Sequence, residues 1–361
     1  MDIILTISKL EDPRMERTKR HRLEDVLFLC ICGTIAGCDS LTEIETFGET
    51  HLAWLRQYVP LAGGVPSHDT LGRVLARVDP QALSACLNQC VQNMHDLCAQ
   101  APTHLAIDGK TLRRSARHGP RTDALHVVSA WSSEHQLSYG EVSVDHKSNE
   151  ITAIPELLDI LSIKDCVVTI DAMGCQKSIA GRIVDKGGAY ILTLKNNHRL
   201  LCEEVKDCFA RFQPEPQYEQ TECTKGETET RRLAVLRADT WLTEAADWPG
   251  LQTVVQLERR RGTTVEIRYF ISSLPPEYDR WAQVIRQHWA IENDLHWQLD
   301  VSFREDASAI SVGNAPHNMN ILRKTALSLI KQDKSTKGSV KNKRLRAGWD
   351  HRLLENILHL T

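Results

Sequence analysis

The sequence has few aromatic residues and lacks any long apolar run. Aromatic side chains make up 6% of the 361 residues, and the longest apolar stretch, residues 26–36, is far too short to cross a bilayer. Asp2 stands where a secretory signal would carry Lys or Arg. We therefore expect a cytoplasmic protein with no membrane partner.

Cysteine pairs of the kind that bind zinc are also missing. The eleven cysteines are an odd number, irregularly spaced, and they include no CxxC motif. This argues against a disulfide scaffold and against a structural zinc site. Most of them stand among Leu, Ile, Val and Ala, where a reduced thiol behaves as a small buried hydrophobe. Reduced structural thiols are the favoured interpretation.

The chain has no large excess of charge of either sign. Its net charge is −3, from 44 Lys and Arg against 47 Asp and Glu. The basic residues are nevertheless clustered: residues 331–346 carry seven positive charges and one negative, a second group lies in residues 14–22, and a third in residues 110–121. Such patches predict local phosphate contacts, with a solvated surface as the alternative for the tail.

What the sequence does contain is material for more than one hydrophobic core. Apolar residues make up 42% of the chain, and 361 residues exceed what one core usually holds. Residues 20–100 have helical spacing, with Ser67 or Asp69 as a candidate helix start. We expect residues 1–100 to form an all-helical N-terminal domain, either DNA-binding or accessory.

The pattern changes after Pro102 to strands and helices in alternation. The expected strands are residues 104–108, 125–131, 137–144, 166–171 and 189–194, and the expected helices are residues 151–161 and 176–186. Polar β-branched segments follow, and helical spacing resumes at residues 280–298, 318–330 and from 353. This predicts an α/β domain over residues 101–199 and 281–330, a mostly β insertion at 200–280, and a basic C-terminal tail and helix at 331–361.

Two acids stand directly after apolar strands. Asp108 ends the segment HLAID, and Asp171 ends CVVTID. Open α/β sheets place ligands at the carboxyl ends of their strands, so the two carboxylates would lie side by side if the strands are neighbours. Either acid taken alone is more often a turn or helix cap. Two adjacent carboxylates need a cation, and hard oxygen ligands select Mg²⁺ or Mn²⁺.

A third acid is found in the segment RQHWAIENDLHWQLD, which begins at Arg286. On an α-helix, His288, Glu292 and His296 fall on one stripe, which admits a zinc hydrolase as an alternative. A rise of about 1.5 Å per residue separates the two histidines by about 12 Å, so the three side chains cannot all bind one ion.

Five motifs together resemble the bacterial insertion-sequence DDE transposases, in the branch of the H-repeat-associated proteins: GVPSHDTLGRVL, AIDGKTLRRS, KSNEITAIPELL, VTIDAMGCQK and HWAIENDLHWQLDVSFRED. The resemblance implies an RNase H-like catalytic domain split by a β insertion. It also implies DNA cleavage and strand transfer at the ends of a mobile element, with two Mg²⁺ or Mn²⁺ ions. By motif, Asp108, Asp171 and Glu292 become the catalytic and metal-binding residues.

The same resemblance implies partners and a location. The expected partner is double-stranded DNA carrying the terminal inverted repeats of the element, bound by a homodimer in the bacterial cytoplasm at the nucleoid. A catalytically idle, domesticated descendant that only binds DNA is the alternative.

One family signature is altered in this sequence. Related transposases often carry Tyr-x2-Arg-x3-Glu-x6-Lys around the catalytic Glu, and those positions hold Ile285, His288 and Leu299 here. We expect His288, with Arg286 nearby, to replace the Arg, whereas the Lys has no clear replacement. The other expected DNA contacts are basic residues near the two strand ends: Lys110, Arg113, Arg114, Arg117 and Lys195.

Overall fold

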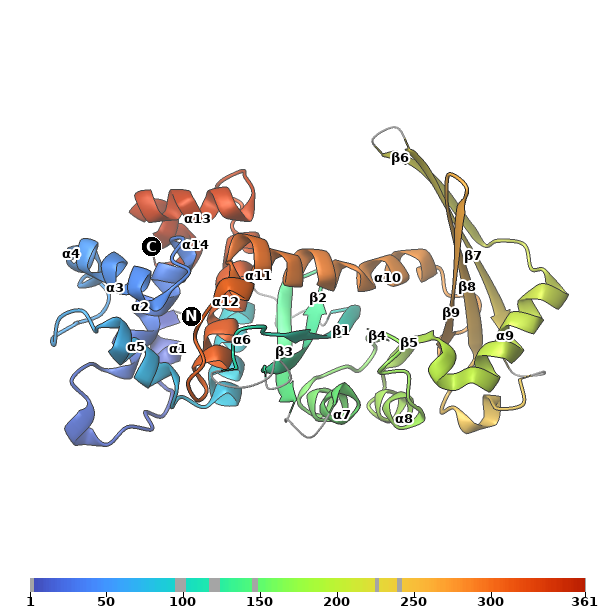
Figure 1. Ribbon diagram of the computed structural model, residues 1–361, viewed down its shortest axis with the longest axis horizontal. Helices are drawn as coiled ribbons and strands as arrows, with labels where there is room; N and C mark the ends of the chain where they lie inside the picture. The colour runs from blue at the N-terminus through green and yellow to red at the C-terminus, as the bar shows by residue number, and fades with distance from the viewer. Residues whose placement is uncertain are drawn as a thin grey trace. The chain divides into compact units, whose positions relative to one another are not determined.

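The computed structural model describes residues 3–94, 102–116, 124–144, 149–224, 227–238 and 242–360. The chain is a mixed α/β protein that forms two compact units (Figure 1). Unit 1 comprises residues 1–101, 109–147 and 292–361, and unit 2 comprises residues 102–108 and 148–291. Strand β1 (His104–Thr111) begins in unit 2 and ends in unit 1.

The first part of unit 1 is helical, as its sequence spacing predicts. Its α-helices are α1 (Ile3–Ile7), α2 (Leu23–Ile35), α3 (Leu41–Thr50), α4 (Leu52–Leu55), α5 (His68–Leu75) and α6 (Pro80–Met94). Ser67 is the N-cap of α5, where its side chain accepts a hydrogen bond from Thr70 N. The domain of residues 1–100 stays a prediction, since unit 1 also contains later parts of the chain.

The later parts of unit 1 surround one central helix, α12 (Ala315–Gln332). It is buried from Ala315 to Ile330 and contacts α2, α5, α6 and strand β3. The remaining elements of this part are β2 (His126–Ser132), β3 (Leu137–Val144), α11 (Trp297–Ser302), α13 (Val340–Trp349) and α14 (His351–Leu358). No helix in the described ranges is both long enough and apolar enough to span a membrane.

The basic tail is not simply a solvated surface. Of its seven basic residues, Lys343 and Arg344 are buried, and the side chain of Lys331 is only 12% exposed. Lys343 Nζ donates to Ile330 O, and Arg344 Nε donates to Thr34 O. The sequence showed the charges but not which of them are buried, because their hydrogen-bond partners lie in other segments of the chain.

Unit 2 contains both parallel and antiparallel strands, with helices packed beside them. Its elements are α7 (Glu150–Ile160), β4 (Val167–Ile170), α8 (Lys177–Asp185), β5 (Ala189–Leu194), α9 (Arg199–Phe212), β6 (Tyr218–Thr224), β7 (Glu227–Arg237), β8 (Thr253–Arg261), β9 (Thr264–Ser272) and α10 (Trp281–His288). Figure 1 shows α7 and α8 on one side of β4 and β5, with α10 on the other. Trp281, Val284 and Ile285 pack α10 onto the sheet.

The strands lie in the order β3-β2-β1-β4-β5-β9-β8-β7-β6. Strands β1, β4 and β5 are parallel, whereas β9 pairs with β5 in the antiparallel sense and β6 to β9 form an antiparallel meander. The β segments expected within residues 200–280 are therefore present. They continue the existing sheet, and helix α9 precedes them, which the sequence analysis missed.

Two further boundaries differ from the expected ones. Strand β1 does not stop at Asp108 but continues to Thr111, and Leu112 N donates to Leu125 O beside β2. The helix expected over residues 280–298 is interrupted by a π-helical turn at Ile291–His296. Sequence spacing could not show this turn, because helical-wheel arithmetic assumes 3.6 residues per turn throughout.

Candidate active site

Asp108 and Asp171 stand at neighbouring positions on adjacent strands of unit 2. Strands β1 and β4 run parallel with Ile107 opposite Ile170, so the two acids follow in the same register. Adjacent strands are about 4.8 Å apart. The residues just before both acids are buried, whereas the acids themselves are only partly buried. The sheet therefore presents two carboxylates together at one edge.

The loop after β4 fixes the carboxylate of Asp171. Its Oδ1 accepts hydrogen bonds from Met173 N at 2.9 Å and from Gly174 N at 3.3 Å. A Cβ atom on Gly174 would stand 2.3 Å from Ile170 Cγ2 and 2.9 Å from Ile154 Cδ1. Only glycine fits this close approach, so the sequence DAMG forms a turn that holds the acid in place.

The segment after β5 braces the same loop. Asn197 Nδ2 donates to Ala172 O at 2.7 Å, and His198 Nε2 lies 2.6 Å from Cys175 O. Lys195 follows β5 and is exposed. Because β4 and β5 are parallel, with Ile170 opposite Leu192, Lys195 belongs to the same edge as Asp171. Asn197 and His198 were not predicted as site residues, although polar residues directly after a predicted strand were a usable signal.

His288 lies beneath the strand ends in a chain of hydrogen bonds. Its Nδ1 is 3.0 Å from Thr169 Oγ1, which is itself 2.8 Å from His104 Nε2. Burial, followed by the charge of Arg268, lowers the pKa of His288 to about 4. The hydrogen bond to Thr169 links α10 to β4. Because the imidazole is neutral at neutral pH, His288 presents no positive charge to DNA.

Arg286 is exposed and already has a partner within unit 2. Its NH1 is 2.9 Å from Glu222 Oε1, and Arg231 NH1 lies 3.2 Å from the other oxygen of that carboxylate. The guanidinium of Arg268 lies over the ring of the nearby Trp289, 4.1 Å from the ring centroid. A phosphate contact by Arg286 would therefore compete with this ion pair.

Glu292 is an exposed residue in the π-helical turn and belongs to unit 1. Its neighbours Ile291 and Leu295 are fully buried. Since π-helices close i→i+5 hydrogen bonds, the single stripe expected for His288, Glu292 and His296 does not hold. Burial and then Lys324 lower the pKa of His296 to about 3. Within the described residues, no three His, Cys, Asp or Glu side chains are grouped as a metal site.

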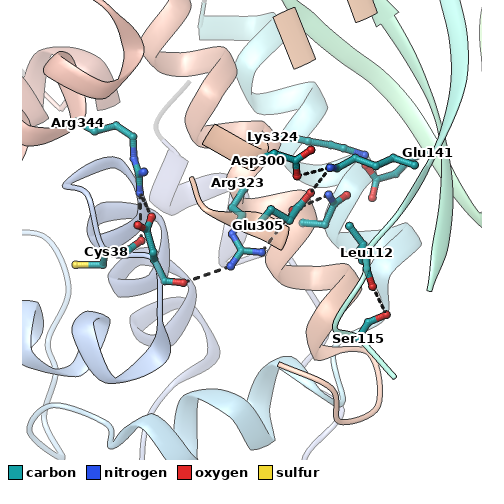
Figure 2. Close-up of polar contacts among 12 residues, drawn as sticks. Cys38, Leu112, Ser115, Glu141, Asp300, Glu305, Arg323, Lys324 and Arg344 are labelled. Atoms are coloured by element: carbon teal, nitrogen blue, oxygen red, sulfur yellow. Dashed lines mark hydrogen bonds and ion pairs between the residues drawn. The ribbon is translucent and has the colours of Figure 1, made fainter. Parts of the chain in front are cut away.

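Lys110 is held in an ion-pair cluster of unit 1 whose members Asp300, Glu305 and Arg323 are labelled in Figure 2. Its side chain is 10% exposed, and Nζ lies 2.5 Å from Asp300 Oδ1 and 3.8 Å from Glu305 Oε2. Glu305 in turn accepts from Asn320 Nδ2 and pairs with Arg323. Burial, offset by Lys110, raises the pKa of Asp300. The charge of Lys110 is thus balanced inside the protein.

The arginines after β1 differ from Lys110. Arg113 is 76% exposed and pairs loosely with Asp306 at 3.3 Å, and Arg114 is also exposed. Both side chains are accessible to a phosphate. Arg117 lies outside the described residues.

Two family profiles match this chain. The profile of the transposase DDE domain matches residues 99–329, and the profile of the DDE transposase-associated domain matches residues 4–91. The first match includes both strand-end acids and Glu292.

Several curated proteins are similar over nearly the whole chain. YncI of Escherichia coli O157:H7, assigned as a transposase, is 38% identical over 98% of this chain and 93% of its own length. YhhI of E. coli K12, assigned as an H repeat-associated transposase, is 36% identical over 98% and 96%. Among solved structures, the piggyBac transposase synaptic complex with hairpin DNA covers 99% of this chain and 78% of its own, with a TM-score of 0.46 and 14% identity.

Proposed function

The chain belongs to the DDE-domain transposases and is similar to their H repeat-associated members, and on this premise we propose that it cleaves DNA and transfers strands at the ends of an insertion-sequence-like element. The observation that carries the proposal is the register of β1 and β4, which brings Asp108 beside Asp171. In this proposal Glu292 is the third catalytic carboxylate.

The donor set fits a hard divalent cation. Two carboxylates at one sheet edge repel each other unless a cation lies between them, and oxygen donors of this kind suit Mg²⁺ or Mn²⁺. We propose that Asp108, Asp171 and Glu292 hold two such ions. When bound, a pair of divalent ions activates the attacking water or 3′-hydroxyl and stabilises the leaving oxygen of the scissile phosphate.

The protein's own contribution is orientation. The two amide hydrogen bonds to Asp171 Oδ1 hold that carboxylate, and Asn197 and His198 hold its loop. Lys195, exposed at the same edge, would contact DNA phosphate. Preorganised groups of this kind lower the barrier because they need no rearrangement during the reaction.

Arg113 and Arg114 are the strongest DNA contacts among the remaining candidates, because both are exposed. DNA contacts by Lys110, Arg286 and His288 stay predictions, because a phosphate would have to compete with the partners that these side chains have within the protein. The contact by Arg117 stays a prediction from sequence. The strand order β3-β2-β1-β4-β5, continued after β5 by the insertion, supports an RNase H-like domain split by a β segment. We further propose a homodimer on paired inverted repeats at the bacterial nucleoid.

The test is cleavage of a duplex that carries both ends of the element encoding this protein. Asp108→Asn, Asp171→Asn and Glu292→Gln should each reduce Mg²⁺-dependent cleavage about 1,000-fold, because metal assistance supplies several kcal/mol of transition-state stabilisation. DNA binding should persist, since the lost charge does not contact phosphate.

Asp185→Asn is the matched control, because Asp185 is an exposed acid on α8 of the same unit. Asp300→Asn tests the rival third carboxylate, which pairs with Lys110. Full cleavage by Asp108→Asn or Asp171→Asn would refute the site. DNA binding by a wild-type protein that cleaves nothing would instead support the idle descendant.

A further inference from the structure

A basic cavity lies in the N-terminal helical part of unit 1. Its volume is about 370 Å³, and its charged lining consists of Arg14, Arg20, His21, Arg73 and Arg77. None of its described lining residues is acidic. The hydroxyl groups of Ser67 and Thr70, at the start of α5, lie in the same wall. A cavity with this lining favours an anion.

Arg14 is the buried arginine among the residues that line the cavity. It is 8% exposed, its Nε and NH2 donate to the two oxygens of Asp12 at 2.9 and 2.7 Å, and NH2 also donates to His21 O at 2.8 Å. This guanidinium is held in place by a bidentate pair, and Asp12 balances its charge.

The positive charges of the other arginines are not balanced by an ion pair within the described residues. Arg20, Arg73 and Arg77 are exposed, and no ion pair joins them to a carboxylate of the described residues. Arg73 Nε donates to Asp69 O at 3.1 Å, which orients the side chain without neutralising it. Three unbalanced guanidinium groups at one cavity repel each other unless an anion is bound among them.

His21 lines the cavity as a buried imidazole with an unpaired nitrogen. Its side chain is 6% exposed, and Nδ1 has no hydrogen-bond partner, although the ring is hydrogen-bonded to the backbone of Gly64. An unpaired buried polar atom costs about 1–3 kcal/mol. Burial, followed by the charges of Arg20 and Arg14, lowers the pKa of His21, so the positive charge of the cavity comes from the arginines.

We propose that this cavity binds a phosphate group of the DNA backbone, with Arg20, Arg73 and Arg77 around the anion. The inference rests on the proposed function in that the phosphate belongs to DNA. Guanidinium forks match phosphate geometry, and backbone contacts of this kind set the position of a duplex without reading its sequence.

The experiment compares the double variant Arg73→Gln/Arg77→Gln with the wild type. Binding of a labelled duplex is measured over a series of KCl concentrations, without divalent ions. The steepness of the plot of log K against log salt should fall by about one unit, because the double variant loses one phosphate contact. Arg352→Gln is the matched control, since Arg352 is an exposed arginine of the same unit, and its slope should equal that of the wild type.

Titration calorimetry with inorganic phosphate forms the second arm. We expect the wild type to bind phosphate and the double variant to lose that binding. If the double variant loses phosphate binding but keeps the wild-type salt slope, the cavity takes a free phosphate and the DNA contact is overturned. Wild-type protein that binds no duplex would refute the proposed function, and the phosphate titration would still decide whether the cavity is an anion site.

Discussion

At the scale of single residues, Glu141 is a buried carboxylate whose charge is balanced by neighbouring side chains. It is 4% exposed on β3, with Lys324 Nζ at 2.6 Å and His317 Nε2 at 2.8 Å from its two oxygens. Burial alone would raise its pKa, but Lys324 and His317 outweigh burial and lower the pKa of Glu141 to about 2. This pair joins β3 to α12 inside unit 1.

Replacing Glu141 should therefore destabilise the protein. We expect Glu141→Gln to lower the free energy of unfolding by about 3–5 kcal/mol, because it leaves Lys324 buried without a counter-charge. The measurement is urea unfolding followed by circular dichroism. The double variant Glu141→Gln/Lys324→Met is the control and should recover much of the loss.

The pH dependence of the free energy of unfolding gives a second test with the same variant. A carboxyl group whose pKa is lowered on folding contributes stability above its unfolded value of about 4.5, and the contribution is lost as the pH falls towards 2. The stability difference between wild type and Glu141→Gln should shrink over this range. A constant difference would contradict the ion-pair account.

At the scale of elements, the sequence predicted regular segments well and interruptions poorly. The expected strands at residues 137–144 and 189–194 match β3 and β5, and Asp171 does follow β4. The apolar run of residues 189–194, with Gly187 and Gly188 before it, is an example of a local signal. The continuation of β1 past Asp108 was missed because Asp108 was taken as the end of the apolar run. The π-helical turn was missed because a helical wheel assumes 3.6 residues per turn.

The candidate site was predictable to a similar extent. The apolar run before each acid indicated a strand, and β1 and β4 are neighbours in register. Asp171 follows the end of β4, whereas β1 continues past Asp108. The internal partners of Lys110 and His288 come from segments 119 to 190 residues away in the chain. No local pattern distinguishes a lysine that binds phosphate from one that pairs with a buried acid.

The basic residues of helix α13 and of the segment before it fall into two sets. Some are buried and contact the rest of unit 1, and others are exposed. Arg344 on α13 is 3% exposed, donates to Thr34 O, pairs with Asp39 and stacks on the ring of Phe303. In contrast, four basic residues of the tail are exposed: Lys334, Lys337, Lys341 and Arg346. The two sets should have different effects when they are changed.

We expect the combined change of these four exposed residues to serine to reduce the salt slope of DNA binding while leaving the melting temperature nearly unchanged. Arg344→Met should instead lower the free energy of unfolding by about 3 kcal/mol, because it leaves Asp39 and the carbonyl of Thr34 without their donor. Differential scanning fluorimetry with salt-dependent binding separates the two effects. An unchanged slope in the fourfold variant would mean that the tail contacts no DNA.

At the scale of the whole molecule, two of the three proposed catalytic acids are terminal residues of chain segments that belong to different units. Asp108 is the last residue of the first segment of unit 2, and Glu292 is the first residue of the last segment of unit 1. Asp171 lies within unit 2, beside Asp108. The central claim is that these acids bind divalent metal for DNA cleavage.

The most direct measurement is a change of metal preference in Asp171→Cys. A thiolate is a softer ligand than a carboxylate and disfavours Mg²⁺ more than Mn²⁺. The account predicts that Asp171→Cys cleaves element-end DNA poorly with Mg²⁺ and regains cleavage with Mn²⁺, whereas Asp185→Cys behaves as the wild type with both ions. Equal cleavage by Asp171→Cys with Mg²⁺ and by the wild type would contradict metal binding at this carboxylate.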